Sequence, residues 1–219
     1  MSNKNNSKKY PNPLLKTILE KREIEYNGVK HKIRSNIKLD EGRVLYDLIV
    51  NNKMSKTMEI GLANGVSALF ICQALKDVGT DGAAHLALDP FQTEQWKDIG
   101  VKNIEKAGLT DYFSVIQEKS EYALPVIAKK QAGTFDLIFI DGWHTFDNTL
   151  IDFFYANLCL KVGGYIVIDD VLHKGVGKVV RYIDSNYKHY KKIHTGVKTN
   201  AVYKKLGEDT KEWFFHKNF

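Results

Sequence analysis

The order of strand-like and helix-like segments after residue 57 is the feature that most constrains the fold. Short apolar runs, rich in residues that favour strands, alternate with longer segments in which apolar residues recur at helical spacing. The strand-like runs are Thr57–Ile60, His85–Asp89, Tyr112–Gln117, Phe135–Ile140 and Tyr165–Asp169. The helix-like segments between them are Val66–Val78, Trp96–Ala107, Glu121–Lys130 and Phe146–Leu160. Strands that alternate with helices and are joined by right-handed crossovers form a parallel, doubly wound sheet, so an α/β fold is predicted.

The end of the chain predicts an antiparallel edge to this sheet. Gly163-Gly164 is expected to end the helix before it, and one more helix fits Gly177–Asn186. Tyr190–Thr195 and Ala201–Leu206 are then separated by too few residues for a parallel crossover, which needs a dozen or more. We therefore predict a single Rossmann-like sheet of seven strands that is mostly parallel and ends in an antiparallel C-terminal hairpin.

The segment before residue 57 predicts a cap on this domain. Residues 1–13 are dominated by Asn, Lys and Ser and are expected to be a disordered tail. Residues 14–56 predict a short helix, a hairpin around Asn27-Gly28 and a helix that starts at an Asp40 cap and runs through Val50. With 57–219 as the main domain and no linker composition in between, we expect one folded domain.

Composition excludes several classes of protein. No apolar run approaches the ~20 residues of a membrane span, and the N-terminus lacks the apolar stretch of a secretory signal. Cys72 and Cys159 both lie in apolar helical patterns, which predicts buried free thiols and a cytoplasmic location. The formal charge of +6 comes from residues 1–34 and 187–219, whereas the centre is net acidic. A nucleic-acid partner is therefore disfavoured, although attraction of an anionic substrate to the basic ends stays open.

A glycine-bearing turn follows the first predicted strand of the domain. Gly61 and Gly65 let the backbone approach a ligand closely, but their spacing is neither that of a pyrophosphate-binding dinucleotide motif nor that of a P-loop. A carboxylate at the end of the next strand, Asp89, is placed to accept both hydroxyls of a ribose. Together they favour a nucleoside ligand without a phosphate group. A plain tight turn and a structural Asp before Pro90 are the alternatives.

Three carboxylates end the two most apolar strands. Asp141 follows Phe135–Ile140, and Asp169 and Asp170 end the strand that begins at Tyr165. If the two strands are neighbours, about 4.8 Å apart, their carboxylates reach one ion. Because consecutive strand residues point to opposite faces, Asp169 and Asp170 both bind it only if the chain turns at Asp170. Oxygen ligands favour a hard cation such as Mg²⁺. The alternative is that Asp170 caps the next segment and Asp169 bonds to backbone.

These motifs together resemble the class I S-adenosylmethionine-dependent methyltransferases, and more narrowly the divalent-metal-dependent O-methyltransferases of the catechol and antibiotic-sugar types. The resemblance runs from about Ser35 to the C-terminus. It rests on Glu-Ile-Gly-x-x-x-Gly-x-Ser at 59–67, the acid strand at 86–90, FIDGWH at 139–144 and IDDV at 168–171. The resemblance implies that S-adenosylmethionine is the cofactor, that a hydroxyl of a small molecule or sugar is the acceptor, and that a homodimer is an expected state.

The resemblance also implies roles for individual residues. By this resemblance, Gly61, Ala63 and Ser67 line the methionine end of the cofactor, Glu59 supports the turn, and Asn36 closes over that end. Asp89 takes the ribose hydroxyls, and Ser120 and Trp143 border the adenine. Gly65 and Asp141 also lie beside the cofactor. The implied metal ligands are Asp141, Asp169 and Asp170.

Two positions depart from the family pattern. A Gly-Asp or Gly-Ala pair often precedes Ser120 in the family, and this chain has Glu118-Lys119 there. Three residues after the first metal aspartate, where catechol-type enzymes carry a lysine base, this chain has His144. An imidazole with a pKa near ~6.5 suits proton abstraction near neutral pH, so His144 and the metal ligand Asp141 are the predicted catalytic residues. Helix capping by His144, or a role in supporting a neighbour, is the alternative, and His173 is a second candidate base.

The leading hypothesis is thus an S-adenosylmethionine-dependent O-methyltransferase assisted by a divalent cation. Methylation of nitrogen or of a nucleic acid is a second hypothesis, because the basic termini could grip phosphates. A module that binds the cofactor without catalysis is a third. A nicotinamide oxidoreductase is disfavoured by the glycine spacing.

Overall fold

The computed structural model describes residues 10–219, and the tail predicted for residues 1–13 falls largely outside the described residues. Seven strands form one sheet in the order β5-β4-β3-β6-β7-β9-β8, and a separate two-stranded hairpin pairs β1 with β2. The backbone divides into two compact units, one comprising the residues up to Ser55 with Leu62–Gln117, the other Lys56–Gly61 with Glu118–Phe219. The predicted α/β sheet of seven strands is confirmed.

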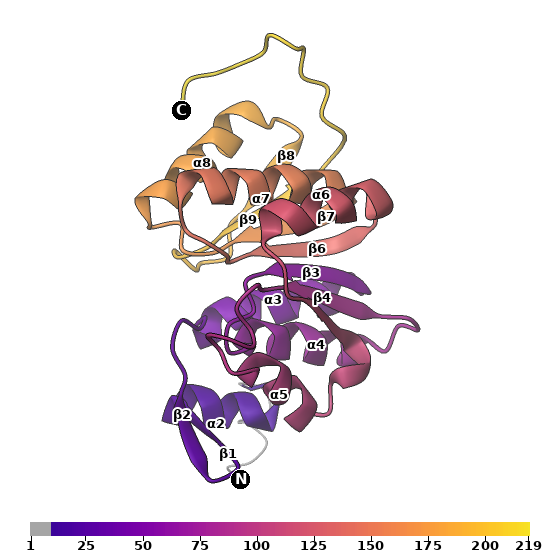
Figure 1. The fold of residues 1–219 in the computed structure, drawn as a ribbon. Helices are drawn as coiled ribbons and strands as arrows, with labels where there is room; N and C mark the ends of the chain where they lie inside the picture. The colour runs from indigo at the N-terminus through magenta and orange to yellow at the C-terminus, as the bar shows by residue number, and fades with distance from the viewer. Residues whose placement is uncertain (1–9) are drawn as a thin grey trace. The chain divides into compact units, whose positions relative to one another are not determined.

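In the part of the first unit that the structure describes, from residue 10 on, there are the hairpin, four α-helices and two strands of the sheet (Figure 1). Its elements are α2 (Pro13–Lys21), β1 (Glu23–Tyr26), β2 (Val29–Lys32), α3 (Leu39–Asn52), α4 (Val66–Val78), β4 (Ala84–Leu88), α5 (Ile99–Lys106), the 3₁₀ turn η1 (Thr110–Tyr112) and β5 (Phe113–Ile116). β4 and β5 pair in parallel, as predicted for strands joined by a helical crossover. α4 is the central helix because its residues are apolar on nearly all sides, and nine of its thirteen residues are buried.

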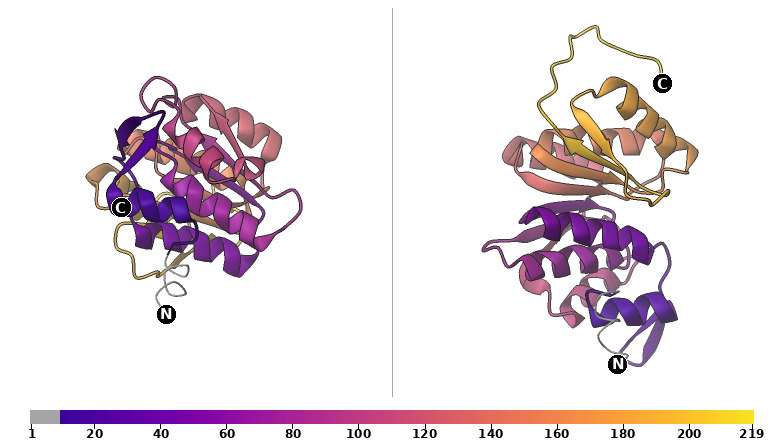
Figure 2. Two further views of the ribbon diagram at one scale, coloured as in Figure 1. Left: turned by 90° about the horizontal axis from the view of Figure 1, so that it is seen from below. Right: turned by 180° about the vertical axis from the view of Figure 1, so that it is seen from behind.

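The second unit holds the other five strands and three helices, with the helices α6, α7 and α8 on one face of its strands (Figures 1 and 2). Its elements are β3 (Lys56–Ile60), α6 (Ser120–Gln131), β6 (Phe135–Ile140), α7 (Phe146–Cys159), β7 (Leu160–Ile168), α8 (Lys174–Asn186), β8 (Tyr190–Ile193) and β9 (Ala201–Lys205). β3, β6 and β7 run parallel, while β9 pairs antiparallel with both β7 and β8. The predicted antiparallel C-terminal edge is confirmed.

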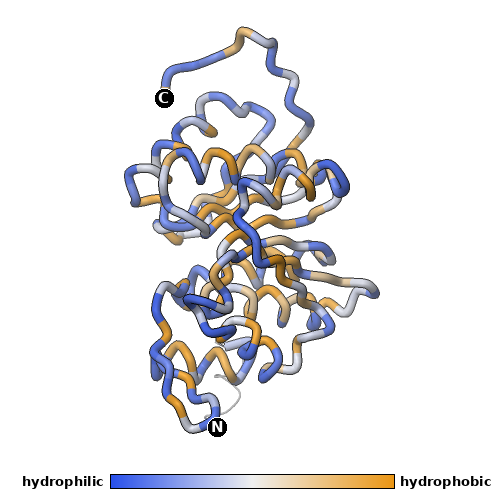
Figure 3. The backbone as a smooth tube through the Cα atoms, viewed as in Figure 1, coloured by the Kyte–Doolittle hydropathy of each residue, from blue (hydrophilic) through white to orange (hydrophobic). Residues whose placement is uncertain are grey.

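The core of the second unit lies along β6 and β7. All six residues of β6 are buried, and the two strands stand out as hydrophobic segments in Figure 3. A central parallel strand is covered on both faces, which explains why β6 reads as a continuous apolar run rather than an alternating one. Both strands stop just before their carboxylates, at Ile140 and Ile168, so Asp141, Asp169 and Asp170 lie in the turns beyond them.

Several predicted boundaries are wrong, including the start of β7 at Leu160 rather than Tyr165 and the start of α8 at Lys174 rather than Gly177. The helix before the Gly163-Gly164 pair ends at Cys159, because the buried Leu160 is already extended and both glycines belong to β7, where the register with β6 shifts. α5 begins at Ile99 rather than at Trp96, since Asp98 takes left-handed backbone angles. α3 begins at Leu39 with Lys38 rather than Asp40 as its cap, and the Glu41 carboxylate accepts the Lys38 backbone N–H at 2.5 Å.

Both cysteines, Cys72 and Cys159, are buried free thiols, as predicted. Among residues 10–219, none of the helices has the length and apolar character that crossing a membrane requires.

Candidate functional site

Two aspartates and a histidine of the second unit converge beyond the ends of β6 and β7. His144 Nε2 lies 3.2 Å from Asp141 Oδ1 and 3.4 Å from Asp170 Oδ2. One potential ligand atom from each of these residues lies within 4.8 Å of the other two. We call Asp141, His144 and Asp170 the acidic cluster. His173, the residue just before α8, has its Nε2 4.0 Å from Asp170 Oδ2 and its ring centroid 5.2 Å from that of His144.

The backbone brings these side chains together by ending two neighbouring strands at the same level. The N–H of Asp141 donates to the Ile60 carbonyl at 2.9 Å, and the N–H of Asp169 donates to the Ile140 carbonyl at 3.0 Å, so the ladder continues one residue past each strand. Asp170 then has φ +53°, a left-handed conformation that reverses the chain. This is the turn that the sequence requires if the second carboxylate of the pair is to reach the Asp141 side.

Asp169 does not belong to the acidic cluster. Its side chain is buried, whereas the side chain of Asp170 is 43% exposed, because consecutive residues at a strand end point in different directions. The negative charge of Asp169 nevertheless contributes to a raised pKa of His144. The structure thus groups His144 with two of the three predicted metal ligands.

The electrostatics of the acidic cluster show an excess of negative charge. Burial raises the pKa of Asp141 to about 6 even though the hydrogen bond to His144 lowers it, and the charges of Asp170 and Glu59 raise it further. The pKa of His144 is raised chiefly by its hydrogen bond to Asp141. Asp141 and Asp170 are therefore both stabilised by a nearby cation, and within the acidic cluster the protonated imidazole of His144 is such a cation.

The donor set of the acidic cluster fits a divalent cation. Two carboxylates offer the hard oxygen ligands that Mg²⁺ and Mn²⁺ prefer, and the imidazole nitrogen adds a donor that Mn²⁺ accepts more readily than Mg²⁺. All three side chains are half-buried.

Gly61 is required by packing at the end of β3. A Cβ on Gly61, which has φ +95°, would lie 2.1 Å from the backbone carbonyl oxygen of Asp141. The β3 end and the Asp141 turn can therefore approach only because this residue has no side chain. Glu59, two residues earlier, is buried opposite Phe139 on β6, and its charge is one of those that raise the Asp141 pKa.

In the first unit, Asp89 holds the turn that precedes α4. Its Oδ2 accepts the backbone N–H of Leu62 at 3.2 Å and of Ala63 at 2.7 Å, together with the side-chain amide of Gln92 at 2.8 Å. Its Oδ1 accepts the N–H of Phe91 at 2.8 Å. Asp89 thus has the structural role that the sequence left open, and Oδ1 keeps lone-pair capacity for a further donor.

The other predicted residues of this turn are shaped by the same packing. Ala63 has φ +45°, Gly65 caps α4 with φ +72°, and Ser67 is buried in its first turn. A Cβ on Gly65 would lie 2.9 Å from the carbonyl oxygen of Gly100, so the N-terminal ends of α4 and α5 meet at their glycines.

Two buried amides were missed by the sequence reasoning. The Asn64 side chain donates to the Arg34 carbonyl at 2.7 Å, and the Asn64 carbonyl accepts the Asn103 amide at 2.8 Å. Asn103 Oδ1 in turn accepts the Tyr26 hydroxyl of the hairpin at 2.6 Å. An Asn within a turn is common, and the residues joined by these three bonds are 30 to 77 positions apart in the sequence, so only the fold reveals this chain of bonds.

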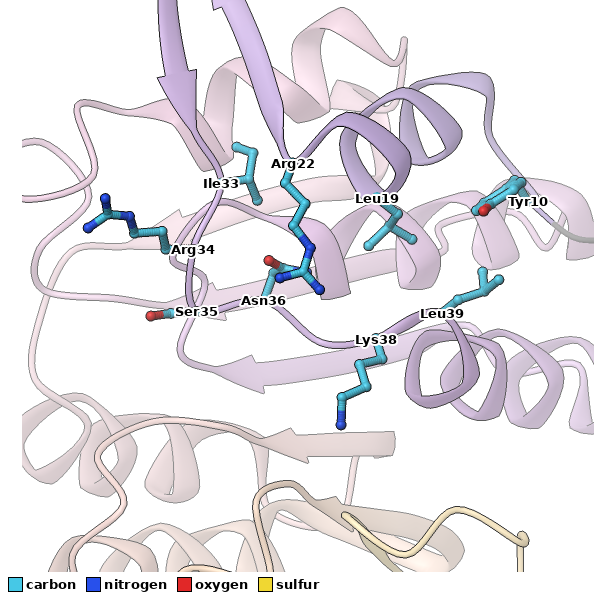
Figure 4. Close-up of a pocket in the computed structure, with 9 residues that line it drawn as sticks. All are labelled: Tyr10, Leu19, Arg22, Ile33, Arg34, Ser35, Asn36, Lys38 and Leu39. Carbon is cyan, nitrogen blue, oxygen red and sulfur yellow. The ribbon is translucent and has the colours of Figure 1, made fainter.

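Asn36 lies in a pocket of about 510 Å³ between α2, the hairpin and the start of α3 (Figure 4). The residues that line it are Tyr10, Leu19, Arg22, Ile33, Arg34, Ser35, Asn36, Lys38 and Leu39. The side-chain amide of Asn36 donates to the Ile37 carbonyl at 2.9 Å. The cationic groups of Arg22, Arg34 and Lys38 give the pocket a positive lining that suits an anionic group.

Ser120 and Trp143, the predicted adenine neighbours, both belong to the second unit. Ser120 is the first residue of α6 and is half-buried. Trp143 follows Asp141 in the turn after β6, and 64% of its surface is exposed. Their role as adenine neighbours stays a prediction.

Comparison with protein families matches residues 58–171 to a model described as a methyltransferase domain. The match runs from β3 to just past Asp170 and so includes the glycine turn, Asp89 and the acidic cluster. The chain belongs to this methyltransferase family. Asn36 and His173 lie outside the matched range.

Plant enzymes are among the relatives of this methyltransferase domain. Caffeoyl-CoA O-methyltransferase 2 of Petunia hybrida is 37% identical over 145 residues, which is 62% of this chain and 54% of that protein. Caffeoyl-CoA O-methyltransferase 2 of Eucalyptus globulus is 33% identical over 160 residues, covering 69% and 58% of the two chains. The chain therefore spans little more than half the length of these curated relatives.

Solved methyltransferase structures share the fold. A Bacillus cereus O-methyltransferase in complex with S-adenosylhomocysteine aligns with TM-score 0.63 and 21% identity over 77% of this chain and 81% of that one. A Podospora anserina methyltransferase bound to S-adenosylhomocysteine aligns with TM-score 0.69 and 16% identity over 89% and 88%. At these identities the likeness establishes the Rossmann-like methyltransferase fold.

Proposed function

We propose that this chain is an S-adenosylmethionine-dependent O-methyltransferase that methylates a hydroxyl group of a small molecule and uses a divalent cation. The observation that carries the proposal is the acidic cluster, in which Asp141, His144 and Asp170 converge within a methyltransferase domain. The plant relatives named as caffeoyl-CoA O-methyltransferases support oxygen as the methylated atom. A small-molecule acceptor requires neither a membrane nor a nucleic acid, and the cytoplasm and a homodimer belong to the proposal as the expected location and assembly.

The cofactor-binding residues are proposed unit by unit. In the first unit Asp89 takes the ribose hydroxyls through Oδ1, and Asn36, Ala63, Gly65 and Ser67 contact the methionine portion. In the second unit Ser120 and Trp143 border the adenine, while the remaining proposed contacts are Glu59, Gly61 and Asp141. Bound S-adenosylmethionine supplies the electrophilic methyl group, and the residues of this chain hold the acceptor oxygen in line with it.

Asp141 and Asp170 are the proposed ligands of the cation, and Asp169 supports them from its buried position. A bound divalent cation lowers the pKa of a coordinated hydroxyl and so makes it a better nucleophile. Mg²⁺ is the proposed ion because carboxylate oxygens predominate in the acidic cluster.

His144 is the proposed general base. Its hydrogen bond to Asp141 fixes one ring nitrogen and orients the imidazole, as a carboxylate does for a catalytic histidine. His144 would accept the proton of the acceptor hydroxyl, whose oxygen would bond to the methyl carbon as the bond between that carbon and the sulfonium sulfur breaks, with S-adenosylhomocysteine as the leaving group. His173, whose ring neighbours His144 and is 58% exposed at its side chain, can pass that proton to solvent.

A substitution of His144 tests its role. His144→Gln should lower methyl transfer roughly 100-fold or more, because general base catalysis contributes about 10²- to 10⁴-fold. The affinity for Mg²⁺ and Mn²⁺, measured by calorimetry, should stay within a few-fold of the unchanged protein. A loss of metal affinity as large as the loss of activity would instead make His144 a metal ligand. His216→Gln, a histidine of the C-terminal segment outside the cluster, is the matched control.

A further inference from the structure

Asp152 is a buried carboxylic acid that the proposed mechanism does not use. It lies in the middle of α7, too far from the helix N-terminus to cap it, and only 1% of its surface is exposed. Its Oδ1 has no hydrogen-bond partner among the described residues. A carboxyl group buried without a full set of partners is costly, so its presence at an interior helix position calls for a reason other than packing.

The surroundings of Asp152 are the two segments proposed to border the adenine. A Cβ on Gly142, which stands between Asp141 and Trp143, would lie 3.4 Å from Asp152 Oδ2. On the other side, a hydrogen bond from the Ser120 hydroxyl lowers the pKa of Asp152, while burial, the larger influence, raises it to about 7. Asp152 therefore lies next to Gly142, in the turn that carries Trp143, and within hydrogen-bonding reach of Ser120, the first residue of α6.

The exposure of the pair gives the two residues different tasks. Ser120 is half-buried and reaches the surface, whereas Asp152 is enclosed. A hydroxyl has one proton to donate and two lone pairs that accept. Once its proton is directed inward to a carboxyl oxygen of Asp152, which can accept it in either protonation state, the outward side of the Ser120 hydroxyl can only accept a hydrogen bond.

We infer that Asp152 is a positioning residue that fixes the Ser120 hydroxyl as an acceptor and thereby selects a nucleobase with an exocyclic amino group. The inference rests on the proposed function, because it takes the nucleobase to be the adenine of the cofactor. The 6-amino group of adenine donates to such an acceptor, whereas the 6-oxo group of hypoxanthine presents a lone pair to it. A site with a fixed acceptor discriminates between these bases because the wrong one leaves polar groups unpaired.

The pair of substitutions at Asp152 separates positioning from packing. Asp152→Leu has a similar volume and removes the acceptor, while Asp152→Asn keeps an amide oxygen that can accept the Ser120 proton. Ser120→Ala removes the hydroxyl itself and Ser120→Thr restores it. Glu121→Gln, a change in the neighbouring charge that also acts on Asp152, is the matched control.

The measurement is the ratio of dissociation constants for S-adenosylhomocysteine and S-inosylhomocysteine, obtained by calorimetry on the full chain and on each variant. We expect the unchanged protein to prefer the adenine compound by about 10- to 100-fold. Asp152→Leu and Ser120→Ala should each reduce the preference to a few-fold, the double variant should reduce it no further, and Asp152→Asn, Ser120→Thr and Glu121→Gln should keep most of it. Melting temperatures establish that the variants are folded.

Three outcomes would overturn the inference. A full preference in Asp152→Leu removes Asp152 from the selection, and a full preference in Ser120→Ala removes the acceptor. If neither compound binds the unchanged protein, the inference falls together with the cofactor of the proposed function. Tight binding of both compounds without a preference would leave that cofactor class intact and would sink the Asp152 inference alone.

Discussion

In the first unit the carboxylate of Asp89 is enclosed by donors of its own chain, whereas in the second unit Asp141 and Asp170 face each other with one imidazole between them. Asp89 accepts hydrogen bonds from three backbone N–H groups and one side-chain amide, so its oxygens have partners within the chain. The acidic cluster has fewer donors and more charge. Asp89 therefore stabilises a turn and keeps one lone-pair position for a ligand. Asp141 and Asp170 have too few donors around them and would be stabilised by a bound cation.

The largest effect expected from this contrast follows substitution of Asp141. Asp141→Asn should abolish divalent cation binding. It should also lower methyl transfer by more than roughly 10- to 100-fold, which is the usual loss when a residue that only supports a metal ligand is substituted. Asp170→Asn should do nearly as much. Calorimetric titration with Mg²⁺ and Mn²⁺ checks both.

Asp169→Asn is the comparison within the same turn. Since Asp169 lies outside the acidic cluster, we expect Asp169→Asn to lower the affinity for the divalent cation less than Asp170→Asn does. Equal losses at the two positions would restore Asp169 as a direct ligand and would contradict the grouping that the structure shows.

A glycine substitution tests whether the acidic cluster depends on the close approach at the end of β3. Gly61→Ala should lower the free energy of unfolding by about 4 kcal/mol or more, because the added Cβ would lie 2.1 Å from the Asp141 carbonyl oxygen. Gly82→Ala, at φ +70° with no atom within 4 Å, should cost only the about 1–2 kcal/mol of left-handed backbone. Urea unfolding gives both values, and similar costs at the two sites would refute the contact.

Asp89 offers the corresponding test in the first unit. Asp89→Asn should lower the affinity for S-adenosylhomocysteine roughly 10-fold or more, because a hydrogen bond to a charged group is worth about 1.5–3 kcal/mol. The affinity for Mg²⁺ should stay unchanged. Asp98→Asn, which alters a carboxylate that accepts the exposed Thr93 hydroxyl at 2.9 Å, is the control. A change in Mg²⁺ affinity would erase the contrast between the two units.

Much of this contrast could be predicted from the sequence, and the parts that could not share a physical cause. The alternation of strands and helices and the apolar run of β6 predicted the parallel sheet. The position of Asp89 and Asp141 at the ends of strands identified them as candidate site residues. The division of labour between Asp169 and Asp170 depends on one left-handed residue, which an aspartate adopts too rarely for a pattern to predict. The Asn64–Asn103–Tyr26 bonds join distant segments, and local spacing carries no information about them.

The place of Gly163-Gly164 shows the same limit for the fold. Two glycines after an apolar helical pattern are typical of a helix end, yet here they belong to a strand. Burial of Leu160 against the sheet decides the boundary, and burial is set by tertiary packing rather than by the glycines.

The smallest expected effect concerns the pH dependence of stability. Burial raises the pKa of Asp152 to about 7 from its ordinary 3.8, so between these values the folded chain holds a proton that the unfolded chain has released. Stability contributed by this group therefore falls as pH rises through that window, by on the order of 1–2 kcal/mol once relaxation and water entry are allowed for. Asp152→Leu should flatten this slope, which urea unfolding at pH 5 and pH 8 measures. An unchanged slope would show that Asp152 is ionised in the fold throughout.

The most direct test of the account is methyl transfer from S-adenosylmethionine to a panel of small hydroxyl compounds, including catechols and hydroxylated sugars, after removal of metal by EDTA and again after Mg²⁺ or Mn²⁺ is added back. We expect methylation of oxygen only after the cation is restored, and none in Asp141→Asn. Methyl transfer at full rate in EDTA, or in Asp141→Asn, would contradict the central role given to the acidic cluster.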